Sequence, residues 1–472
     1  MPRSPRRPQR LAVPPLSSEH HLPPFPLTLT EVAPGGDAVG RRDDGLVVFV
    51  PGGTPGDEAL VQLVRSHRSY AHGRLLRLLT PGPLRVSPPC ALALPADNGA
   101  SAACGGCPLM AMGREAQLAA KQAWVTRAMR QLPIETRPIL APAAAQGYRL
   151  RARLLLRGGR LGFAAAGSHH GSQPSACPVL LPELSRALFE RCQVLVPALG
   201  EGGALSGLAG WHNGQPAIHL AVEPANPSRT GLATLRQGLA QLLSAGDIVG
   251  ASLHTASTPS SPSREPELHG VPYISLVPPG DTDALGPLWG AASGFAQACQ
   301  AGHTLLPRLV AEAARGAAAP DGTAPLPRVL ELFSGSGNLS RALWPLTDEL
   351  ICVEGDAAAV DRARAALGTG PRLLAEPVID ALRRLRRGAV LPTVVVLDPP
   401  RAGAAEAMPL VAELAPRRVV YVSCDVMTLA RDLGQLRAHG YVPRYVQPID
   451  LMPHTAEIEC IAVCDASDPR GG

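Results

Sequence analysis

Lysine, aromatic side chains and long apolar runs are all scarce in this sequence of 472 residues. No stretch reaches the roughly 18 consecutive apolar residues that a membrane span requires, so we expect no membrane-spanning helix. The first ten residues contain four arginines and no apolar run, which argues against a secretion signal and predicts a cytoplasmic protein. Lys121 is the only lysine among 44 lysine and arginine residues, and high-GC codon usage is the simplest explanation of that bias.

Apolar residues and cysteines, in contrast, are plentiful. A hydrophobic content of 46% over this length is sufficient for two or three domains, each with its own core. The ten cysteines are better interpreted as metal ligands or reactive thiols than as a disulfide framework, because no secretion signal is expected. The net charge of +5 is modest.

The first third of the chain shows a change of pattern near residue 26. Residues 1–25 are basic and rich in proline, and we expect a flexible tail there. Short alternating segments at 27–30, 46–50 and 59–64 are separated by Pro-Gly-Gly and Asp-Gly turns. This pattern predicts a small, OB-like antiparallel barrel over residues 26–85. Barrels of this kind commonly bind nucleic acid.

The remainder divides into two further predicted domains. Residues 86–286 combine cysteines, a Gly-rich loop and a Ser/Pro/Thr-rich loop at 255–263, which indicates a mixed α+β domain with long loops. In residues 287–472, after a linker at 316–325, apolar strands alternate with amphipathic helices. This alternation is typical of an α/β fold with a doubly wound, Rossmann-like and mostly parallel sheet. The expected strands are 329–332, 350–353, 394–397 and 419–422.

Three of these strands end in residues suited to a nucleoside ligand. The first runs into a turn with Gly335 and Gly337, although the third glycine of a dinucleotide fingerprint is absent and a plain turn remains an alternative. The second ends at Glu354, where a carboxylate could accept from ribose hydroxyls. The strand 394–397 is followed by Asp398 and two prolines, at the edge where such sheets bind ligands.

A cysteine and two glutamates lie near the end of the chain. Cys424 follows the apolar strand 419–422 directly, which favours a reactive thiol over a buried structural one. Glu457 and Glu459 alternate with Ile458 before a final strand, so we expect the two carboxylates to share one face. A thiol and a carboxylate are suited to nucleophilic and general-base roles, respectively.

These motifs, together with others along residues 26–465, resemble one family. The strongest are Asp398-Pro-Pro-Arg401, Ser423-Cys424 with Thr428-Leu-Ala-Arg431, and Pro453-His-Thr455 with Glu459. The chain is similar to the uracil-5 RNA methyltransferases, particularly the branch that modifies large-subunit rRNA. Members of the family join an RNA-binding TRAM barrel, an iron-sulfur domain and an S-adenosylmethionine-dependent methyltransferase domain. The resemblance implies methylation of carbon 5 of a uridine in folded RNA, with 23S rRNA expected ahead of tRNA.

The resemblance also implies roles for individual residues. Cys424 resembles the family's nucleophile, and Glu459 resembles its general base. The positions that match the S-adenosylmethionine contacts are Gln297, Phe333, Asn338, Glu354, Asp380 and Asp398. Three positions depart from the family pattern, with Asp425 replacing an asparagine, Glu457 a histidine and Cys299 an asparagine. A charge at Asp425 is expected to disfavour the Cys424 thiolate unless it is paired.

Four cysteines are candidate metal ligands. They are Cys90, Cys104, Cys107 and Cys177, and three of them have a neighbouring proline. The spacing is compatible with either a tetrathiolate zinc site or a four-iron cluster. The resemblance implies a [4Fe-4S] cluster, although the spacer between Cys90 and Cys104 is longer than the family's usual one.

Arginines provide candidate RNA contacts. Three of them alternate along one predicted strand and would share one face, unless that face is simply solvated: Arg149, Arg151 and Arg153. Four more add positive charge to the predicted barrel: Arg65, Arg68, Arg74 and Arg77. Because aromatic residues are only 3% of the chain, we expect recognition through phosphates and shape, with few stacked bases, by a monomer.

Two other functions compete with this interpretation. An amino-group methyltransferase of the same fold also uses an Asp-Pro-Pro turn, but an aromatic residue normally follows it. Arg401 stands there instead, and such an enzyme would leave Cys424 without a role. A non-catalytic RNA-binding protein of the same architecture would not need both Cys424 and Glu459. A tRNA uracil-5 methyltransferase remains an alternative within the family.

Overall fold

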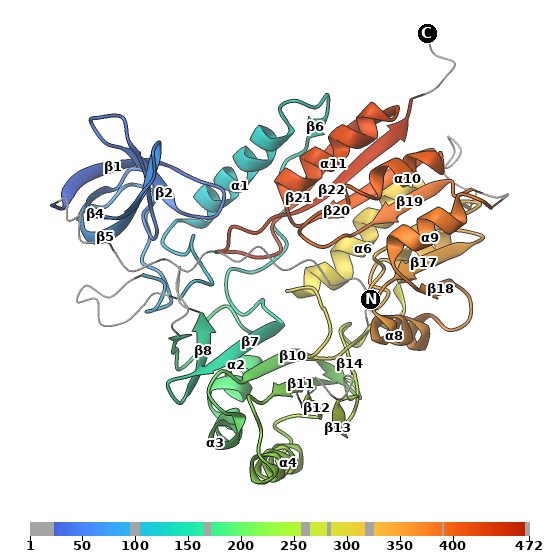
Figure 1. Cartoon of the computed structure of the whole chain (residues 1–472), viewed down its shortest axis with the longest axis horizontal. Coiled ribbons are helices and arrows are strands. Elements are labelled where there is room, and N and C mark those ends of the chain that lie inside the picture. Colours follow the sequence, from blue (N-terminus) through green and yellow to red (C-terminus); the bar gives the residue numbers. More distant parts are fainter. Residues whose placement is uncertain are drawn as a thin grey trace. The chain divides into compact units, whose positions relative to one another are not determined.

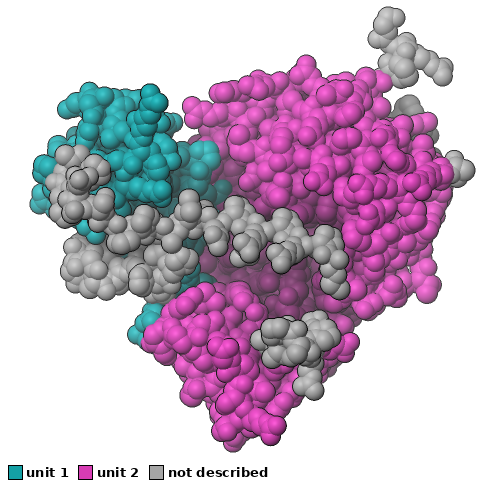
Figure 2. Space-filling view, in the orientation of Figure 1, with its two compact units in different colours: residues 1–117, 160–174, 454–456 teal, residues 118–159, 175–453, 457–472 magenta. Residues whose placement is uncertain are grey.

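The computed structural model describes residues 23–94, 104–164, 171–255, 265–280, 285–316, 325–388 and 391–467. The predicted tail up to residue 22, most of the linker at 316–325 and most of the loop at 255–263 lie outside these residues. The chain forms two compact units, coloured separately in Figure 2. Unit 1 comprises residues 1–117, 160–174 and 454–456, and unit 2 comprises the remainder. In the described ranges, no helix combines the length and apolar character needed to cross a membrane.

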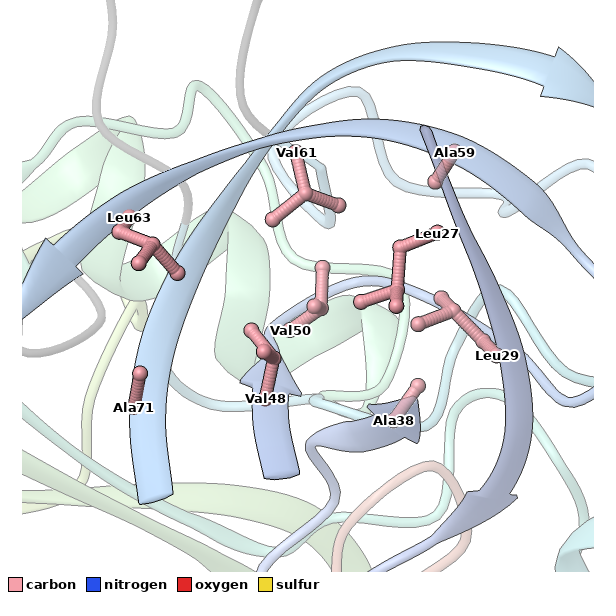
Figure 3. Close-up of a cluster of buried hydrophobic side chains, with 9 residues drawn as sticks. All are labelled: Leu27, Leu29, Ala38, Val48, Val50, Ala59, Val61, Leu63 and Ala71. Carbon is pink, nitrogen blue, oxygen red and sulfur yellow. The ribbon is translucent and has the colours of Figure 1, made fainter. Parts of the chain in front are cut away.

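Unit 1 contains the predicted barrel (Figure 1). Its five strands close in the order β1-β2-β3-β5-β4. They are β1 (Phe25–Val32), β2 (Ala38–Arg41), β3 (Val47–Val50), β4 (Glu58–Ser66) and β5 (Tyr70–Thr80). The prediction of an antiparallel barrel is wrong for one pair, because β3 and β5 run parallel. Alternate side chains point inward, as period-two alternation requires, and they form the core of aliphatic residues in Figure 3. Gly73 is required on β5, because a Cβ there would lie 2.4 Å from Val61 Cγ1.

A buried carboxylate fastens the barrel to the segment that leaves it. Asp57 is fully buried and accepts from the backbone N–H groups of Thr54 at 2.7 Å and Gly82 at 2.9 Å. Arg85 donates to the same carboxylate from Nε at 3.0 Å and from Nη2 at 2.6 Å. These bonds lower the pKa of Asp57 against the opposing effect of burial. A buried charge is stabilising only with such complete pairing.

The first sheet of unit 2 is mainly antiparallel. Its strands β13-β12-β11-β10-β7 are hydrogen-bonded in that order. They are β7 (Arg151–Arg157), β10 (Ala204–His212), β11 (Gln215–Glu223), β12 (Gly250–Leu253) and β13 (Glu267–Gly270). Helices accompany this sheet in the sequence, at α2 (Pro182–Phe189), α3 (Val196–Leu199) and α4 (Arg229–Ser244). This region is the mixed α+β part of the prediction.

The second sheet of unit 2 is the predicted doubly wound one. Its order is β18-β17-β16-β19-β20-β22-β21-β6, and β16 to β20 run parallel to one another. The strands are β6 (Glu135–Thr136), β16 (Val329–Leu332), β17 (Leu350–Glu354), β18 (Arg372–Ala375), β19 (Val394–Leu397), β20 (Arg418–Ser423), β21 (Tyr441–Ile449) and β22 (Glu459–Ala466). All residues of β16 and β19 are buried, as expected for central parallel strands.

Helices alternate with these strands. They are α6 (Gln300–Arg315), α7 (Ser340–Leu343), α8 (Ala357–Leu367), α9 (Val378–Leu385), α10 (Met408–Glu413) and α11 (Val426–Ala438). An earlier helix, α1 (Arg114–Met129), begins in unit 1 and continues in unit 2. The strand-helix alternation confirms the predicted α/β fold and brings the ends of β16, β17, β19 and β20 to one edge of the sheet.

Candidate active site

The parallel register places the predicted cofactor residues along the carboxyl edge of the sheet. Leu332 at the end of β16 pairs with Val353 and with Leu397. Phe333, Glu354 and Asp398 come directly after these three residues and therefore lie side by side. Ligands of doubly wound sheets bind at this edge. The register thus brings three of the predicted cofactor residues to one edge of the sheet.

The turn after β16 is held open by its backbone conformation. Phe333, Gly335 and Gly337 all have positive φ, of 60°, 55° and 88°. Glu354 fixes the turn, because its Oε2 accepts from the Gly335 N–H at 2.9 Å and its Oε1 accepts from the Asp356 N–H at 2.8 Å. No atom lies within 4 Å of a Cβ built on Gly335. A ligand can therefore approach this backbone closely.

Gln297 and Asn338 are brought together through the start of α6. Asn338 Nδ2 donates to the Gly302 carbonyl at 2.9 Å, and a Cβ on Gly302 would lie 2.6 Å from Gln297 Cβ. Asn338 Oδ1 is buried and has no hydrogen-bond partner in the described chain. An orphaned buried acceptor at this edge suits the hydroxyl and amino groups of S-adenosylmethionine. The residues present fit that cofactor.

Asp380 stands apart from the other predicted contacts. It lies in the first turn of α9, its side chain is 61% exposed, and it forms an ion pair with Arg383 at 3.6 Å. The position follows β18, the edge strand of the sheet. In this structure, therefore, Asp380 is at the sheet edge but not among the buried acidic groups near Cys424.

Cys424 and Glu459 lie opposite each other. β20 and β22 are antiparallel, with Val422 paired to Ile461 and Ser423 paired to Cys460. One further step of this register sets Cys424 against Glu459, the first residue of β22. Cys424 is partly exposed, whereas Glu459 is buried with 4% of its surface accessible. The structure thus brings the predicted nucleophile and base together.

Negative charge dominates this part of the site. Burial raises the pKa of Asp398 to about 7, although solvent reaches part of its side chain. Burial, followed by the charges of Asp398 and Glu457, raises the pKa of Glu459 well above its usual value. Burial and the Glu459 charge raise the pKa of the Cys424 thiol to about 12, and Arg401 acts against that increase. A cationic ligand would relieve the repulsion among these carboxylates.

Two of the residues that depart from the family pattern have partners. The Glu457 carboxylate pairs with the Arg401 guanidinium, and its charge also acts on Glu459. Asp425 is the N-cap of α11, and its Oδ1 accepts from the N–H groups of Met427 at 3.0 Å and Thr428 at 2.9 Å. A negative charge is stabilised at a helix N-terminus.

Helix α11 also holds the segment after the Asp-Pro-Pro turn, through Arg431 of the motif and through Asp432, which the sequence did not single out. Asp432 is fully buried, and its Oδ2 accepts from Tyr421 Oη at 2.6 Å and from the Ala404 N–H at 2.7 Å. Arg431 Nη2 donates to the Ala402 carbonyl at 2.9 Å. The only signal for Asp432 was a carboxylate on the apolar face of a predicted helix.

The candidate metal ligands are divided between the units. Cys104 and Cys107 share one turn of unit 1, and the Cys104 N–H donates to the Leu92 carbonyl at 2.7 Å, next to the segment of Cys90. Cys177 belongs to unit 2, where its N–H donates to Ser185 Oγ at 3.1 Å. Within the described ranges, no group of three His, Cys, Asp or Glu residues is arranged to hold a metal ion.

The predicted arginine face is only partly free. Strand β7 begins at Arg151, so Arg149 precedes it and donates from Nε to the Arg151 carbonyl at 3.0 Å. Arg153 pairs with Glu223 on β11. Burial and the charges of Arg149 and Arg153 lower the pKa of Arg151. The three guanidinium groups are therefore close enough to affect one another, and that of Arg153 forms an ion pair with Glu223.

Two family models match the chain: TRAM domain over residues 25–76, and tRNA (Uracil-5-)-methyltransferase over residues 326–465. The 23S rRNA (uracil(1939)-C(5))-methyltransferase RlmD of Pectobacterium atrosepticum is 31% identical, covering 93% of this chain and 92% of that protein. An uncharacterized RNA methyltransferase of Gloeobacter violaceus is also 31% identical, with 93% and 96% covered. The tRNA (uracil-54, C5)-methyltransferase of Pyrococcus abyssi, solved with S-adenosyl-L-homocysteine, has a TM-score of 0.67 at 19% identity, covering 93% and 100%.

The doubly wound sheet has the fold of the Pyrococcus abyssi enzyme, and the family model over residues 326–465 makes this domain a methyltransferase. The barrel adds a TRAM domain to that enzyme. With 31% identity across nearly the whole chain, the protein belongs to the uracil-5 RNA methyltransferase family. It is therefore an RNA-methylating enzyme.

Proposed function

We propose that this enzyme methylates carbon 5 of a uridine in 23S rRNA through a covalent adduct between Cys424 and the uracil. The observation that carries the proposal is the opposition of Cys424 and Glu459 across the β20–β22 register, beside Asp398. A thiol and a carboxylate on one substrate base provide the two functions that this reaction needs.

The proposed reaction begins at Cys424. Its thiolate adds to carbon 6 of the uracil, and the electron pair of the 5,6 double bond moves to form an enolate. Carbon 5 would then attack the methyl carbon of S-adenosylmethionine, whose bond to sulfur breaks with the electron pair remaining on the sulfur of S-adenosylhomocysteine. Glu459 removes the proton from carbon 5, the double bond re-forms and the thiolate leaves. The target base must leave its stack for both residues to reach it.

The charges around Cys424 determine whether its thiol is protonated. The Cys424 thiol holds its proton in the free enzyme because burial and Glu459 raise its pKa. Arg401 is the cation that acts on the same thiol, and Glu457 pairs with Arg401. A positively charged cofactor beside Asp398 would weaken the carboxylate repulsion and favour the thiolate. We expect Gln297, Phe333, Asn338, Glu354, Asp380 and Asp398 to bind that cofactor.

The relatives named as 23S rRNA methyltransferases support rRNA as the substrate. The experiment compares modified nucleosides in rRNA and tRNA from cells with and without the gene. We expect 5-methyluridine to be missing from one position of 23S rRNA and restored by the wild-type gene but not by a Cys424→Ala gene. Loss from tRNA alone would support the tRNA alternative, and no loss from either RNA would contradict enzymatic activity on both.

A [4Fe-4S] cluster is a second part of the proposal, with Cys90, Cys104, Cys107 and Cys177 as its ligands. Their soft thiolates are the donors that iron-sulfur clusters require. The shared turn of Cys104 and Cys107, and the hydrogen bond from Cys104 to the segment of Cys90, support it. No step of the methyl transfer depends on the cluster.

We also propose that RNA contacts the basic residues of the barrel. Arg65, Arg68, Arg74 and Arg77 lie on or beside β4 and β5, in the region matched to the TRAM domain apart from its last arginine. Tyr70 stacks on His67 with ring centroids 4.4 Å apart, and it is partly exposed. Phosphate contacts of this kind would make RNA affinity fall steeply with salt.

A further inference from the structure

The only lysine of the chain is buried against one loop of the catalytic domain. Lys121 lies on α1, and both its side chain and that of Asp450 have 0% exposure. Its Nζ donates to Asp450 Oδ1 at 2.7 Å, to the Met452 carbonyl at 3.1 Å and to the Glu457 carbonyl at 2.8 Å. An ammonium group has three donors, and these acceptors match that number.

The three acceptors lie near the two ends of the connection between β21 and β22. Asp450 directly follows β21, whose last residue, Ile449, pairs with Glu459. Glu457 comes two residues before Glu459, where β22 begins. Lys121 therefore ties together the two ends of the loop at the point where the proposed base enters the sheet.

The geometry of this contact calls for an ammonium group. An ammonium is a compact centre whose three donors diverge, whereas a guanidinium is a larger planar fork suited to bidentate acceptors. Every other basic side chain of Lys or Arg type in this chain is arginine. A buried charge is costly unless fully paired, and here one carboxylate and two carbonyls pair it.

We infer that Lys121 is a positioning residue for Glu459, holding the loop so that the Glu459 carboxylate faces Cys424. This inference rests on the proposed function. Its hydrogen bonds to the Met452 and Glu457 carbonyls act on the backbone of the loop. Its loss should impair removal of the carbon-5 proton more than cysteine addition or methyl transfer, because those earlier steps use Cys424 and the cofactor edge.

The test compares the full-length Lys121→Arg variant with the Lys121→Met, Asp450→Asn double variant. The double variant removes both buried charges together and leaves no unpaired carboxylate. Arg127→Met, at an exposed position of the same helix, is the matched control. Each protein is first checked by thermal melting. Labelled substrate RNA then gives kcat, KM and the fraction of methylated, cysteine-linked RNA on denaturing gels.

We expect both Lys121 variants to lower kcat by about 10- to 100-fold, the effect of misplacing a catalytic group by about 1 Å. KM for RNA should stay within about twofold, and the methylated adduct should accumulate, while Arg127→Met behaves like the parent. Normal kcat, or equal losses of adduct formation and turnover, would overturn the inference. If neither variant folds, Asp450→Asn alone gives the same comparison.

Glu459→Gln, measured in parallel, separates this inference from the proposed function. If Glu459→Gln accumulates the adduct and the Lys121 variants do not, the mechanism stands and the role of Lys121 is wrong. If Glu459→Gln turns over normally, the assignment of the base fails, and the inference about Lys121 fails with it. Adduct accumulation in all three supports both.

Discussion

Cys424 and Glu459 occupy facing positions at the end of an antiparallel strand pair, although 35 residues separate them in the chain. The register that joins β20 to β22 thus sets a thiol on one strand end and a buried carboxylate on the other. Glu459 begins β22, and Cys424 directly follows the last residue of β20, so the register of the two strands places both residues at the same end of the pair. The two residues can therefore be tested as separate halves of one reaction.

The first prediction concerns these halves. Cys424→Ala should abolish turnover and all covalent RNA adducts, because no addition to carbon 6 can occur. In Glu459→Gln, Cys424 should still add to the uracil and the methyl group should still transfer. Loss of the base should slow proton removal from carbon 5 by about 10²- to 10⁴-fold, so a methylated, cysteine-linked RNA should accumulate. Denaturing gels and mass spectrometry of the linked peptide measure it. Normal turnover without an adduct in Glu459→Gln would make Glu457 the next candidate.

The second prediction concerns Asp398 and the stability of the free enzyme. Burial raises its pKa to about 7, so the folded state binds this proton more tightly than the unfolded chain does. Its favourable contribution is complete below about pH 4 and is lost as the pH rises through about 7. Asp398→Asn should therefore raise the melting temperature relative to the parent at pH 8, and raise it less at pH 5.

Thermal melting across this pH range checks the effect, with the exposed Asp380→Asn as the control. The same Asp398→Asn variant should lose methyl transfer, since the carboxylate lies at the proposed cofactor edge. A stability difference that stays constant between pH 5 and pH 8 would show that Asp398 is ionised throughout.

The third prediction concerns Asp425, whose charge the sequence led us to expect would oppose thiolate formation. Its carboxylate caps α11 instead. Asp425→Asn should leave the pH dependence of activity unchanged, because the helix N-terminus already stabilises the Asp425 charge. Asparagine caps a helix as well as aspartate does, so only Asp425→Ala should lower the free energy of unfolding, by about 1 kcal/mol. Activity as a function of pH, with denaturant unfolding, measures both. A shift of the Asn profile to lower pH would restore the original expectation.

The fourth prediction concerns iron. Protein purified without oxygen should be brown and contain about four irons and four sulfides per chain. Cys104→Ser should lose both, and Cys192→Ala, which removes a buried cysteine outside the proposed set, should retain them. Metal analysis and the visible absorption spectrum report the result. Stoichiometric zinc in place of iron would support the tetrathiolate zinc alternative.

Much of the catalytic domain could be predicted because its chemistry lies at strand ends. The apolar runs at Val329–Leu332 and Val394–Leu397 became strands with those same bounds. Residues after such runs necessarily share one edge of a parallel sheet. By contrast, β10 was not predicted, because its first seven residues are all buried and so show no alternation of polar and apolar side chains.

Contacts between distant segments were beyond prediction. The hydrogen bond from Lys121 to Asp450 spans 329 positions, and no local pattern connects them. The only signal was the presence of a single lysine, which composition alone explained as codon usage. Similarly, the Asn338 amide reaches Gly302 across 36 positions, a contact that depends on how α6 packs beside the glycine turn.

The burial of Lys121 has a consequence for chemical labelling. Because the sequence contains no second lysine, any acylated lysine side chain found in this protein must be this one. A fully covered amine can react only when α1 and the β21–β22 loop separate, so the rate of acylation measures the frequency of that single opening event. The rate of Lys121 acylation, measured by mass spectrometry, therefore reports local opening of the structure next to the proposed base without an engineered probe.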